Sequence, residues 1–253
     1  MSKTLITADN HGNHKALYDF ALKNNISTIL QCGDFEPIRS LDDLEHFPAP
    51  SRFVREYRCG DRPLEFADFL EGVPVTTYSI AGNHEPFGWL EQYREMGPHE
   101  LVSNFYYFGN FGVTEVETGI GKLTVAGFSK IFHKVHSLAE NFEPWHPKRR
   151  RLCSPKRAAY FNEADIYALI DACKGQAVDI LLLHENPAKY QSGKLEYGCD
   201  LISDLVKALA PKVAFCGHMH FAAERMIDST RVVNLPINQY FILEDEWGDL
   251  WKK

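Results

Sequence analysis

The sequence predicts an α/β fold in which the strands are at least partly parallel. Apolar runs typical of strands alternate with segments whose apolar residues recur at helical spacing. In addition, short polar motifs repeatedly follow the point where an apolar run ends. Because open α/β sheets gather their functional loops at the carboxyl ends of the strands, the position of these motifs supports the same fold class.

The motif-bearing elements can be placed in chain order. Strands are expected at residues 3–8, 27–31, 75–80, 180–183 and 213–216. Helices are expected at residues 13–24, 162–173 and 200–209, where apolar residues repeat at helical spacing. Residues 104–128 are typical of short strands joined by glycine-containing turns. Because no linker, repeat or low-complexity segment interrupts the pattern, we expect a single domain over residues 1–253.

Composition places the chain among soluble globular proteins. It has 253 residues, of which 45% are hydrophobic and 24% are charged, and this is enough to form a substantial core. Apolar stretches stay well short of the roughly 20 residues that cross a bilayer, and the first residues lack the pattern of a signal peptide. We therefore expect a cytoplasmic protein. Its six cysteines form no Cys-x-x-Cys pair and are expected to be reduced packing residues.

Charge is unevenly distributed along the chain. The formal net charge of −7 argues against a general nucleic-acid coat, because phosphate contacts need clustered cations. Residues 147–157 nevertheless hold six Lys and Arg side chains and two prolines. This basic stretch is either a solvated turn or a loop that meets a polyanion, and the residues alone leave both readings open.

Five polar motifs supply the ligand types that a pair of divalent ions needs. They are Asp9-Asn10-His11, Gly33-Asp34, Gly82-Asn83-His84-Glu85, His184 and Gly217-His218-Met219-His220. Taken singly, each has an ordinary structural reading, such as a turn, a capping pair or a buried histidine. Taken together, two carboxylates, four imidazoles and an amide form a full set for two ions that share one bridge. The ordered set therefore favours a two-metal phosphoester hydrolase.

The motifs also suggest local geometry. Gly33 lets the backbone turn close to an ion, which makes Asp34 a natural bridging ligand at the end of a rigid strand. His218 and His220 are two residues apart, and on an extended segment they would point the same way. His14, which lies outside the ligand set, is expected to be a surface or substrate-rim imidazole.

In this order, the motifs resemble those of the calcineurin-like metallophosphoesterases, with a match that runs from Asp9 to His220. The resemblance implies a two-sheet β sandwich flanked by helices, in α/β/β/α layers. It also implies two metal sites with one shared ligand. One ion would be held by Asp9, His11, Asp34 and His220, and the other by Asp34, Asn83, His184 and His218. Ligand type leaves Mn, Fe, Zn, Co and Ni open as the metal, with Mn favoured for assays.

The resemblance also suggests a mechanism. A hydroxide that bridges the two ions would attack phosphorus in line, without a covalent enzyme intermediate. His84 would face the substrate, where it stabilises the equatorial oxygens or gives a proton to the leaving group. Glu85 would lie outside the ligand shell and orient His84 or a ligand imidazole. The expected function is a binuclear phosphodiesterase. The alternatives are a cyclic-nucleotide, dinucleotide or small phosphomonoester hydrolase and, from another class, a catalytically weak metal-binding scaffold.

Several segments resemble the catalytic core of the RNA lariat debranching enzymes, namely residues 31–36, 82–85, 104–109 and 218–223. This closer resemblance suggests RNA or another nucleotide-derived substrate. It also places the substrate-contacting insert near residues 129–160, which contain Lys148, Arg149, Arg150 and Arg151. One departure concerns the metal site, because eukaryotic debranching enzymes typically carry Cys where this chain has Asp9. The Asp restores the ordinary two-metal ligand set.

Overall fold

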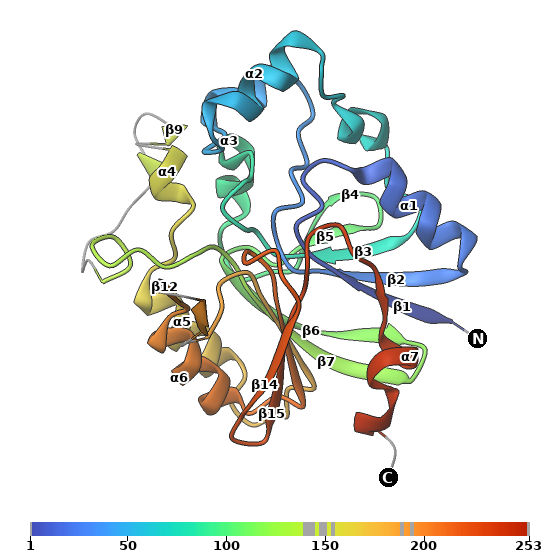
Figure 1. The fold of residues 1–253 in the computed structure, drawn as a ribbon, viewed down its shortest axis with the longest axis vertical. Coiled ribbons are helices and arrows are strands. Elements are labelled where there is room, and N and C mark those ends of the chain that lie inside the picture. The colour runs from blue at the N-terminus through green and yellow to red at the C-terminus, as the bar shows by residue number, and fades with distance from the viewer. Residues whose placement is uncertain are drawn as a thin grey trace.

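Two six-stranded sheets lie at the centre of the molecule, with helices on their outer sides (Figure 1). The computed structural model describes residues 2–138, 145–146, 151–152, 155–187, 190–192 and 195–251. In each sheet four parallel strands form the middle and an antiparallel strand lies at each edge. This mixed arrangement agrees with the expected partly parallel strands.

The strands have the following bounds. The first sheet has the order β16 (Phe241–Ile242), β1 (Lys3–Thr7), β2 (Ile26–Gln31), β3 (Thr76–Ser79), β5 (Phe105–Tyr107) and β4 (His99–Val102). The second has the order β14 (Ala223–Ile227), β15 (Thr230–Asn234), β13 (Val213–Cys216), β10 (Ile180–Leu183), β7 (Gly121–Phe128) and β6 (Phe111–Thr118). Two further pairs are β8 (Trp145–His146) with β9 (Arg151–Leu152), and β11 (Tyr190–Ser192) with β12 (Leu195–Tyr197). The five expected motif-bearing strands are confirmed.

The expected helices are α1 (His14–Lys23), α5 (Glu163–Ala172) and α6 (Asp200–Leu209), and they too are confirmed. Helix α1 packs on the outer face of the first sheet, where Leu17 and Ala21 share a buried cluster with Leu5. Helices α5 and α6 pack on the outer face of the second sheet and lie on the opposite side of the molecule from α1 in Figure 1. The layers therefore run helix, sheet, sheet, helix, which confirms the α/β/β/α fold class.

Strand β10 shows why the motif-bearing runs are almost wholly apolar. Ile180 and Leu182 belong to the cluster between the two sheets, whereas Leu181 and Leu183 belong to the cluster beneath α5 and α6. Side chains of successive strand residues point to opposite faces, and both faces of this strand are covered. The consequence is a run of four leucine and isoleucine residues that are all fully buried.

Several helical elements were not predicted from the sequence. They are η1 (Leu41–His46), α2 (Ser51–Cys59), η2 (Glu65–Phe69), α3 (Phe87–Leu90), η3 (Glu91–Tyr93), α4 (Pro155–Ala158), α7 (Leu243–Trp247) and η4 (Gly248–Trp251). Helix α2 shows the reason, since Tyr57 is its one buried residue and most of its other residues are polar. Its apolar residues Phe53, Val54 and Tyr57 do lie on one face, but a helix of nine residues is too short for this spacing to stand out in the sequence. It ends at Gly60, which adopts a left-handed conformation.

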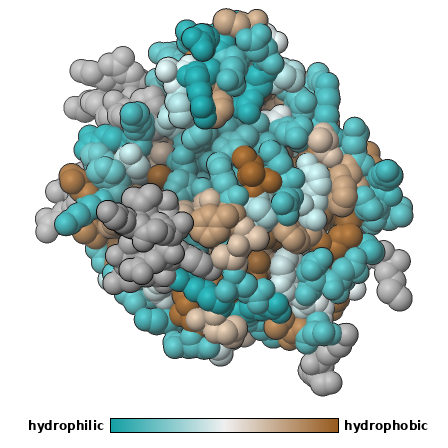
Figure 2. All heavy atoms as spheres, in the orientation of Figure 1, coloured by the Kyte–Doolittle hydropathy of each residue, from teal (hydrophilic) through white to brown (hydrophobic). Residues whose placement is uncertain are grey.

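The surface matches the layered interior. The face drawn in Figure 2 is mostly hydrophilic, because the large apolar side chains are concentrated in the clusters between and outside the sheets. Within the described part of the chain, no helix combines the length and the apolar character that a membrane crossing requires. The described cysteines are all free, and four of the five are buried, in agreement with their expected packing role.

His14 corrects one expectation, because it is buried rather than at the surface or the substrate rim. Its ring packs against Phe35 and Phe66 in the core beneath α1. The Nε2 atom lies 2.8 Å from the carbonyl oxygen of Phe35, and a carbonyl can only accept, so Nε2 carries the proton. This burial was not predictable from the sequence, because a polar first residue of a helix ordinarily faces solvent.

His14 makes a testable contribution to stability. Burial lowers its pKa from 6.5 to about 4, so between these values the unfolded chain binds a proton that the folded chain does not. Stability therefore falls as pH drops through this window, and at pH 5 the expected loss is about 2 kcal/mol. Urea unfolding of His14→Gln at pH 7.5 and pH 5 should show a smaller difference than wild type. Equal differences for the two proteins would contradict this role.

Candidate metal centre

The polar motifs meet where the carboxyl ends of the central strands of both sheets come together. Asp9 follows β1, Asp34 follows β2, His184 directly follows β10, and His218 follows β13. Contacts join the loops of the two sheets: the backbone N–H of His218 donates to both carboxylate oxygens of Asp9, at 3.2 and 3.0 Å. The expected convergence of the strand ends is therefore present.

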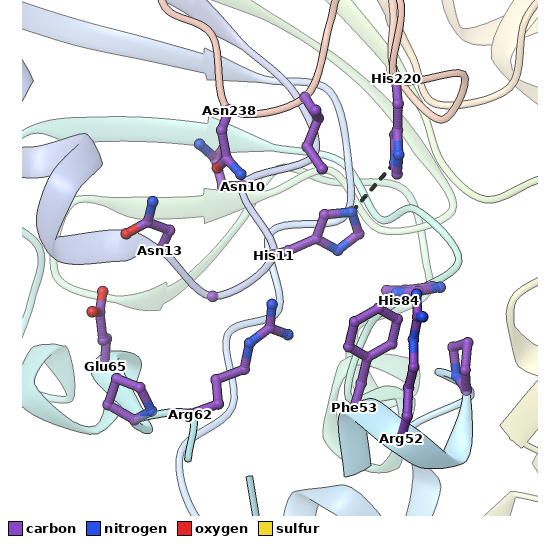
Figure 3. Close-up of a pocket in the computed structure, with 14 residues that line it drawn as sticks. Asn10, His11, Asn13, Arg52, Phe53, Arg62, Glu65, His84, His220 and Asn238 are labelled. Atoms are coloured by element: carbon purple, nitrogen blue, oxygen red, sulfur yellow. Dashed lines mark hydrogen bonds between the residues drawn. The ribbon is translucent and has the colours of Figure 1, made fainter. Parts of the chain in front are cut away.

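Four of the predicted ligands form one compact group. The side chains of Asp9, His11, Asp34 and His220 each offer a ligand atom, and these atoms all lie within 4.8 Å of one another. His220 Nε2 lies 3.3 Å from Asp9 Oδ1 and 3.4 Å from His11 Nε2. Figure 3 shows the imidazoles of His11 and His220 directed toward each other. This group contains the residues that the family resemblance implies for one ion.

The other predicted ligands lie on the far side of Asp34. His184 Nε2 is 3.4 Å from Asp34 Oδ1 and 3.3 Å from Asn83 Oδ1. The ring of His218 lies beside that of His184, with 5.1 Å between the centroids. The second oxygen of Asp34, Oδ2, is 3.9 Å from His11 Nε2. Asp34 therefore stands between two groups of imidazoles and directs one oxygen toward each.

Backbone strain is concentrated at this centre. Twelve non-glycine residues of the described chain have a left-handed φ, and six of them are Asp9, His11, Asp34, Glu36, His218 and His220. This conformation is costly for residues with a side chain and persists where the surroundings hold it in place. The expected extended segment at His218 and His220 is therefore wrong, since their φ values are 70° and 59°. The tight turn, rather than strand alternation, brings both imidazoles to the centre.

Gly82 leaves no room for a side chain beside the predicted ligands. A Cβ at this position would lie 2.1 Å from Asp34 Oδ1 and 2.6 Å from His184 Nε2. Ordinary van der Waals contacts are far longer, so the two side chains would have to move. Position 82 therefore requires glycine, because the loops that carry Asp34 and His184 approach its backbone closely.

Gly82→Ala is expected to destabilise the fold by about 1–3 kcal/mol, the usual cost of overpacking, and to weaken metal binding because it displaces Asp34. Urea unfolding and the metal content after dialysis measure the two effects. Gly248→Ala is a matched control, since a Cβ there meets nothing within 4 Å. A Gly82 variant with the stability and metal content of the control would contradict the crowding argument.

The centre concentrates negative charge. Burial alone would lower the pKa of His11, but its hydrogen bond with Glu36 and the charges of nearby carboxylates raise it to about 9. Burial likewise opposes protonation of His184, yet the charge of Asp34 and a hydrogen bond with it raise the pKa of His184 to about 10. Burial would raise the pKa of Asp34, but the imidazoles of His184, His84 and His11 hold it well below its usual range. Such a site favours cations.

Glu36 is a central residue that the sequence did not assign. Its side chain is fully buried, and Oε1 accepts a hydrogen bond from His11 Nδ1 at 2.8 Å. Its other oxygen accepts from the hydroxyl of Tyr57 at 2.7 Å and from Arg62 at 3.2 Å. A carboxylate on Nδ1 fixes the ring and leaves Nε2 for a metal. One feature of the sequence could have indicated this role. Glu36 is a charged residue between Phe35 and Pro37, in a segment that is otherwise apolar after Asp34.

Glu85 has a different role from the expected one. Its carboxylate accepts backbone N–H groups of Gly82, Phe35 and Glu36, at 3.0–3.2 Å, and no imidazole is among its hydrogen-bond partners in the described chain. Burial and the charge of Asp34 raise its pKa to about 8 despite these donors. Glu85 therefore ties together the two loops that carry Asp34 and His84, whereas Glu36 contacts the imidazole.

His84 lies at the edge of this centre. Its backbone N–H donates to Asp34 Oδ1 at 2.7 Å, which fixes the loop. Its ring lies edge-on to His11, with 5.1 Å between centroids, and also contacts Phe47 and Phe53. The Nδ1 atom is buried, lacks a hydrogen-bond partner in the described chain, and lies 3.6 Å from Glu36 Oε1. Since His84 also lines a cavity of about 600 Å³, its imidazole can reach a bound ligand.

The donor set fits divalent metal ions. Asp9 and Asp34 are buried carboxylates, 0% and 2% exposed, and imidazole nitrogens surround them within 4 Å. Carboxylate oxygens together with imidazole nitrogens are typical ligands of first-row divalent ions. Buried charges of one sign need compensation, and a cation between these groups would supply it. The structure thus contains a candidate metal centre.

The predicted basic contacts fall in a part of the chain about which the structure says little. Lys148, Arg149 and Arg150 lie outside the described residues, and Arg151 is described only as part of β9. Their proposed contact with substrate remains a prediction from the sequence.

Comparison with known proteins agrees with the motifs. Residues 2–222 match the family described as Calcineurin-like phosphoesterase. The chain is similar to the lariat debranching enzyme of Drosophila melanogaster, at 29% identity over 223 residues that cover 78% of this chain and 38% of that enzyme. It is also similar to the lariat debranching enzyme of Schizosaccharomyces pombe, at 25% identity over 231 residues that cover 83% of this chain and 46% of that enzyme. The matched segment spans less than half the length of these curated relatives.

A solved structure shows the same fold. The crystal structure of TT1561 of Thermus thermophilus matches with a TM-score of 0.54 and 18% identity, and the match covers 93% of this chain and 89% of that one. Identity at this level speaks for the fold alone. The sequence and structure matches together confirm the resemblance and the fold class that the motifs indicated.

Proposed function

This chain belongs to the calcineurin-like phosphoesterase family, and from that premise we propose that it is a binuclear metal-dependent phosphodiesterase acting on RNA or another nucleotide derivative. Its proposed ligands are those that the motifs predicted. Asp9, His11, Asp34 and His220 would hold one ion, and Asp34, Asn83, His184 and His218 the other.

The position of Asp34 is the observation that carries this proposal. Its Oδ2 lies 3.9 Å from His11 Nε2, and its Oδ1 lies 3.4 Å from His184 Nε2. A carboxylate that offers separate oxygens to two groups of imidazoles is suited to bridge two ions. A mononuclear site would leave one of these two groups of imidazoles without a ligand role.

The side chains of this chain would divide the work as follows. When bound, two divalent ions supply Lewis acidity and an activated water at neutral pH. Asp9 and Asp34 provide the negative charge that retains cations, and Glu36 holds the His11 ring so that Nε2 faces the centre. Glu85 keeps the loops of Asp34 and His84 in register through their backbone N–H groups.

His84 is the proposed catalytic residue that touches substrate. Because Nδ1 faces Glu36 at 3.6 Å, Nε2 is the nitrogen free to meet a ligand in the adjoining cavity. A protonated imidazole there would donate to a non-bridging oxygen or give its proton to the departing oxygen.

The relatives support a nucleic-acid substrate. Lariat debranching enzymes from several eukaryotes match most of this chain, whereas the chain spans less than half of their length. Their name indicates that they debranch lariats, and our proposal for the present chain is action on branched RNA. The presence of Asp9, with the ordinary ligand set, equally suits a wider range of phosphodiesters.

Cleavage of a synthetic 2′–5′ branched RNA by Mn-loaded protein tests the proposal. A linear RNA, a bis-aryl phosphodiester and an aryl phosphomonoester run alongside it. Selective loss of the branch would support a debranching-like activity, and hydrolysis of the diesters in general would support a broader phosphodiesterase. Hydrolysis of the monoester alone would contradict the phosphodiesterase assignment. Metal loading without any hydrolysis would favour a scaffold.

A further inference from the structure

A cavity of about 600 Å³ opens beside the candidate metal centre. One side is formed by imidazoles of that centre, those of His11, His84 and His220. Another side is formed by Arg52, Phe53 and Arg62, from α2 and the loop after it, and Figure 3 shows these groups around the same space. A cavity of this size accommodates a nucleotide-sized ligand.

The two arginines are held in place by one aromatic ring. The guanidinium carbon of Arg52 lies 4.5 Å from the centroid of Phe53, and that of Arg62 lies 5.3 Å from it. Arg62 also contacts the ring of Tyr57 at 5.1 Å. Guanidinium groups on aromatic faces are attracted to the ring and lose mobility. The cavity therefore has in its wall a pair of cations that share one aromatic ring.

Both guanidinium groups keep N–H donors that are available to a ligand. Arg62 gives one nitrogen to Glu36 at 3.2 Å and keeps its remaining donors, and its side chain is 27% exposed. Arg52 has no carboxylate partner among the described residues. Glu65, also in the cavity wall, accepts the backbone N–H of Lys15 at 2.7 Å. Planar guanidiniums with free donors are suited to phosphate.

The pair lies next to the proposed scissile site. One carboxylate, that of Glu36, contacts His11 through Oε1 and Arg62 through Oε2. The ring of Phe53, which carries both guanidiniums, lies 5.8 Å from the ring of His84. A phosphate held between the metal centre and His84 would therefore have the two arginines beside it, at the position of a neighbouring group in the same ligand.

We propose that Arg52 and Arg62 bind a second phosphate of the substrate, one nucleoside away from the phosphate at the metal centre. This inference rests on the proposed phosphodiesterase function and names its substrate class, an oligonucleotide. A simple ester has one phosphate and leaves the arginines without a partner, whereas an oligonucleotide places its next phosphate in the same cavity. Phosphate contacts of this kind position a nucleic acid without reading its bases.

A matched pair of chromogenic esters tests the proposal. Thymidine 5′-(p-nitrophenyl phosphate) and its 3′-phosphorylated counterpart release the same chromophore, p-nitrophenol, and differ only in the second phosphate. Wild type is expected to favour the 3′-phosphorylated ester by about 10- to 100-fold in kcat/KM, the range of charge-assisted hydrogen bonds. Arg52→Met and Arg62→Gln should each lower this ratio, and the double variant should bring it close to one.

Arg55→Met is the control, because Arg55 lies on the same helix but is exposed and does not line the cavity. It should keep the wild-type ratio. A wild-type ratio near one, or a ratio that survives in the double variant, would overturn the proposal. The ratio compares two substrates of one protein, so a general loss of activity in a variant does not affect it.

Calorimetry of the Mn-loaded protein with product nucleotides, which carry no diester bond to hydrolyse, separates this inference from the proposed function. Thymidine 3′,5′-bisphosphate should bind about tenfold more tightly than thymidine 5′-monophosphate, and the double variant should lose the gain. This binding result would support the phosphate site even if neither ester were hydrolysed. Absence of hydrolysis would count against the proposed function and not against the phosphate site. Equal binding of both nucleotides would overturn the inference. An equal gain with thymidine 5′-diphosphate would assign the arginines to a pyrophosphate and also overturn it.

Discussion

Asp34→Ala is expected to abolish metal binding and hydrolysis together. Its two oxygens face His11 on one side and His184 on the other, so one substitution removes a ligand from both proposed ions. Loss of an outer-shell partner alone commonly costs 10- to 100-fold in metal affinity, and loss of a shared ligand should exceed this. Metal content after dialysis and the rate with a bis-aryl phosphodiester measure the two effects.

Two further variants separate this role from a general loss of structure. Asp34→Asn keeps an oxygen that can accept the backbone N–H of His84, but it lacks the charge. It should fold and still lose metal. Asp43→Ala removes another buried carboxylate, one that pairs with Arg39, and should lower stability while it keeps metal. Full metal content in Asp34→Ala would refute the bridging role.

His84→Ala is expected to retain metal and to lose turnover. The imidazole contacts Glu36 and the cavity rather than the two carboxylates of the proposed ligand set, so metal content should stay at the wild-type level. General acid catalysis by a positioned side chain commonly contributes 10²- to 10⁴-fold, and kcat should fall by about this factor. Steady-state kinetics on Mn-loaded protein, together with its metal content, provides the measurement.

His99→Ala serves as the comparison for His84→Ala. His99 is on the edge strand β4, where its ring contacts Tyr93 and a backbone carbonyl, and it does not line the cavity. This variant should keep both its rate and its metal. If His84→Ala turned over at the wild-type rate, the proposed contact of His84 with the substrate would be wrong.

Several features of the centre were predictable because they are local in the sequence. An apolar run that ends in a carboxylate, an amide or a histidine places that side chain at a strand end, whichever strands lie next to it. For this reason the strands before Asp9, Asp34, His184 and His218 were predicted close to their observed bounds. The order of the motifs then indicated the family, which the match over residues 2–222 confirms.

The errors arose where packing between distant segments decided the outcome. His14 was expected at the surface, but η2 and the segment after β2 cover it with Phe66 and Phe35. Glu85 was expected to orient an imidazole, but the approach of another loop gives it the backbone N–H groups of Phe35 and Glu36. Periodicity along one segment contains no information on which other segment will cover it.

Apolar periodicity and residue chemistry are properties of short segments, and they were enough to predict the fold class, the motif-bearing strands and the set of candidate ligands. Three relations came from packing instead: which oxygen of Asp34 faces which imidazole, the contact of Glu36 with His11, and the ring of Phe53 that Arg52 and Arg62 share beside His84. These relations join residues far apart in the chain. They depend on how two sheets and the α2 segment pack, and on left-handed backbone turns that this packing holds in place.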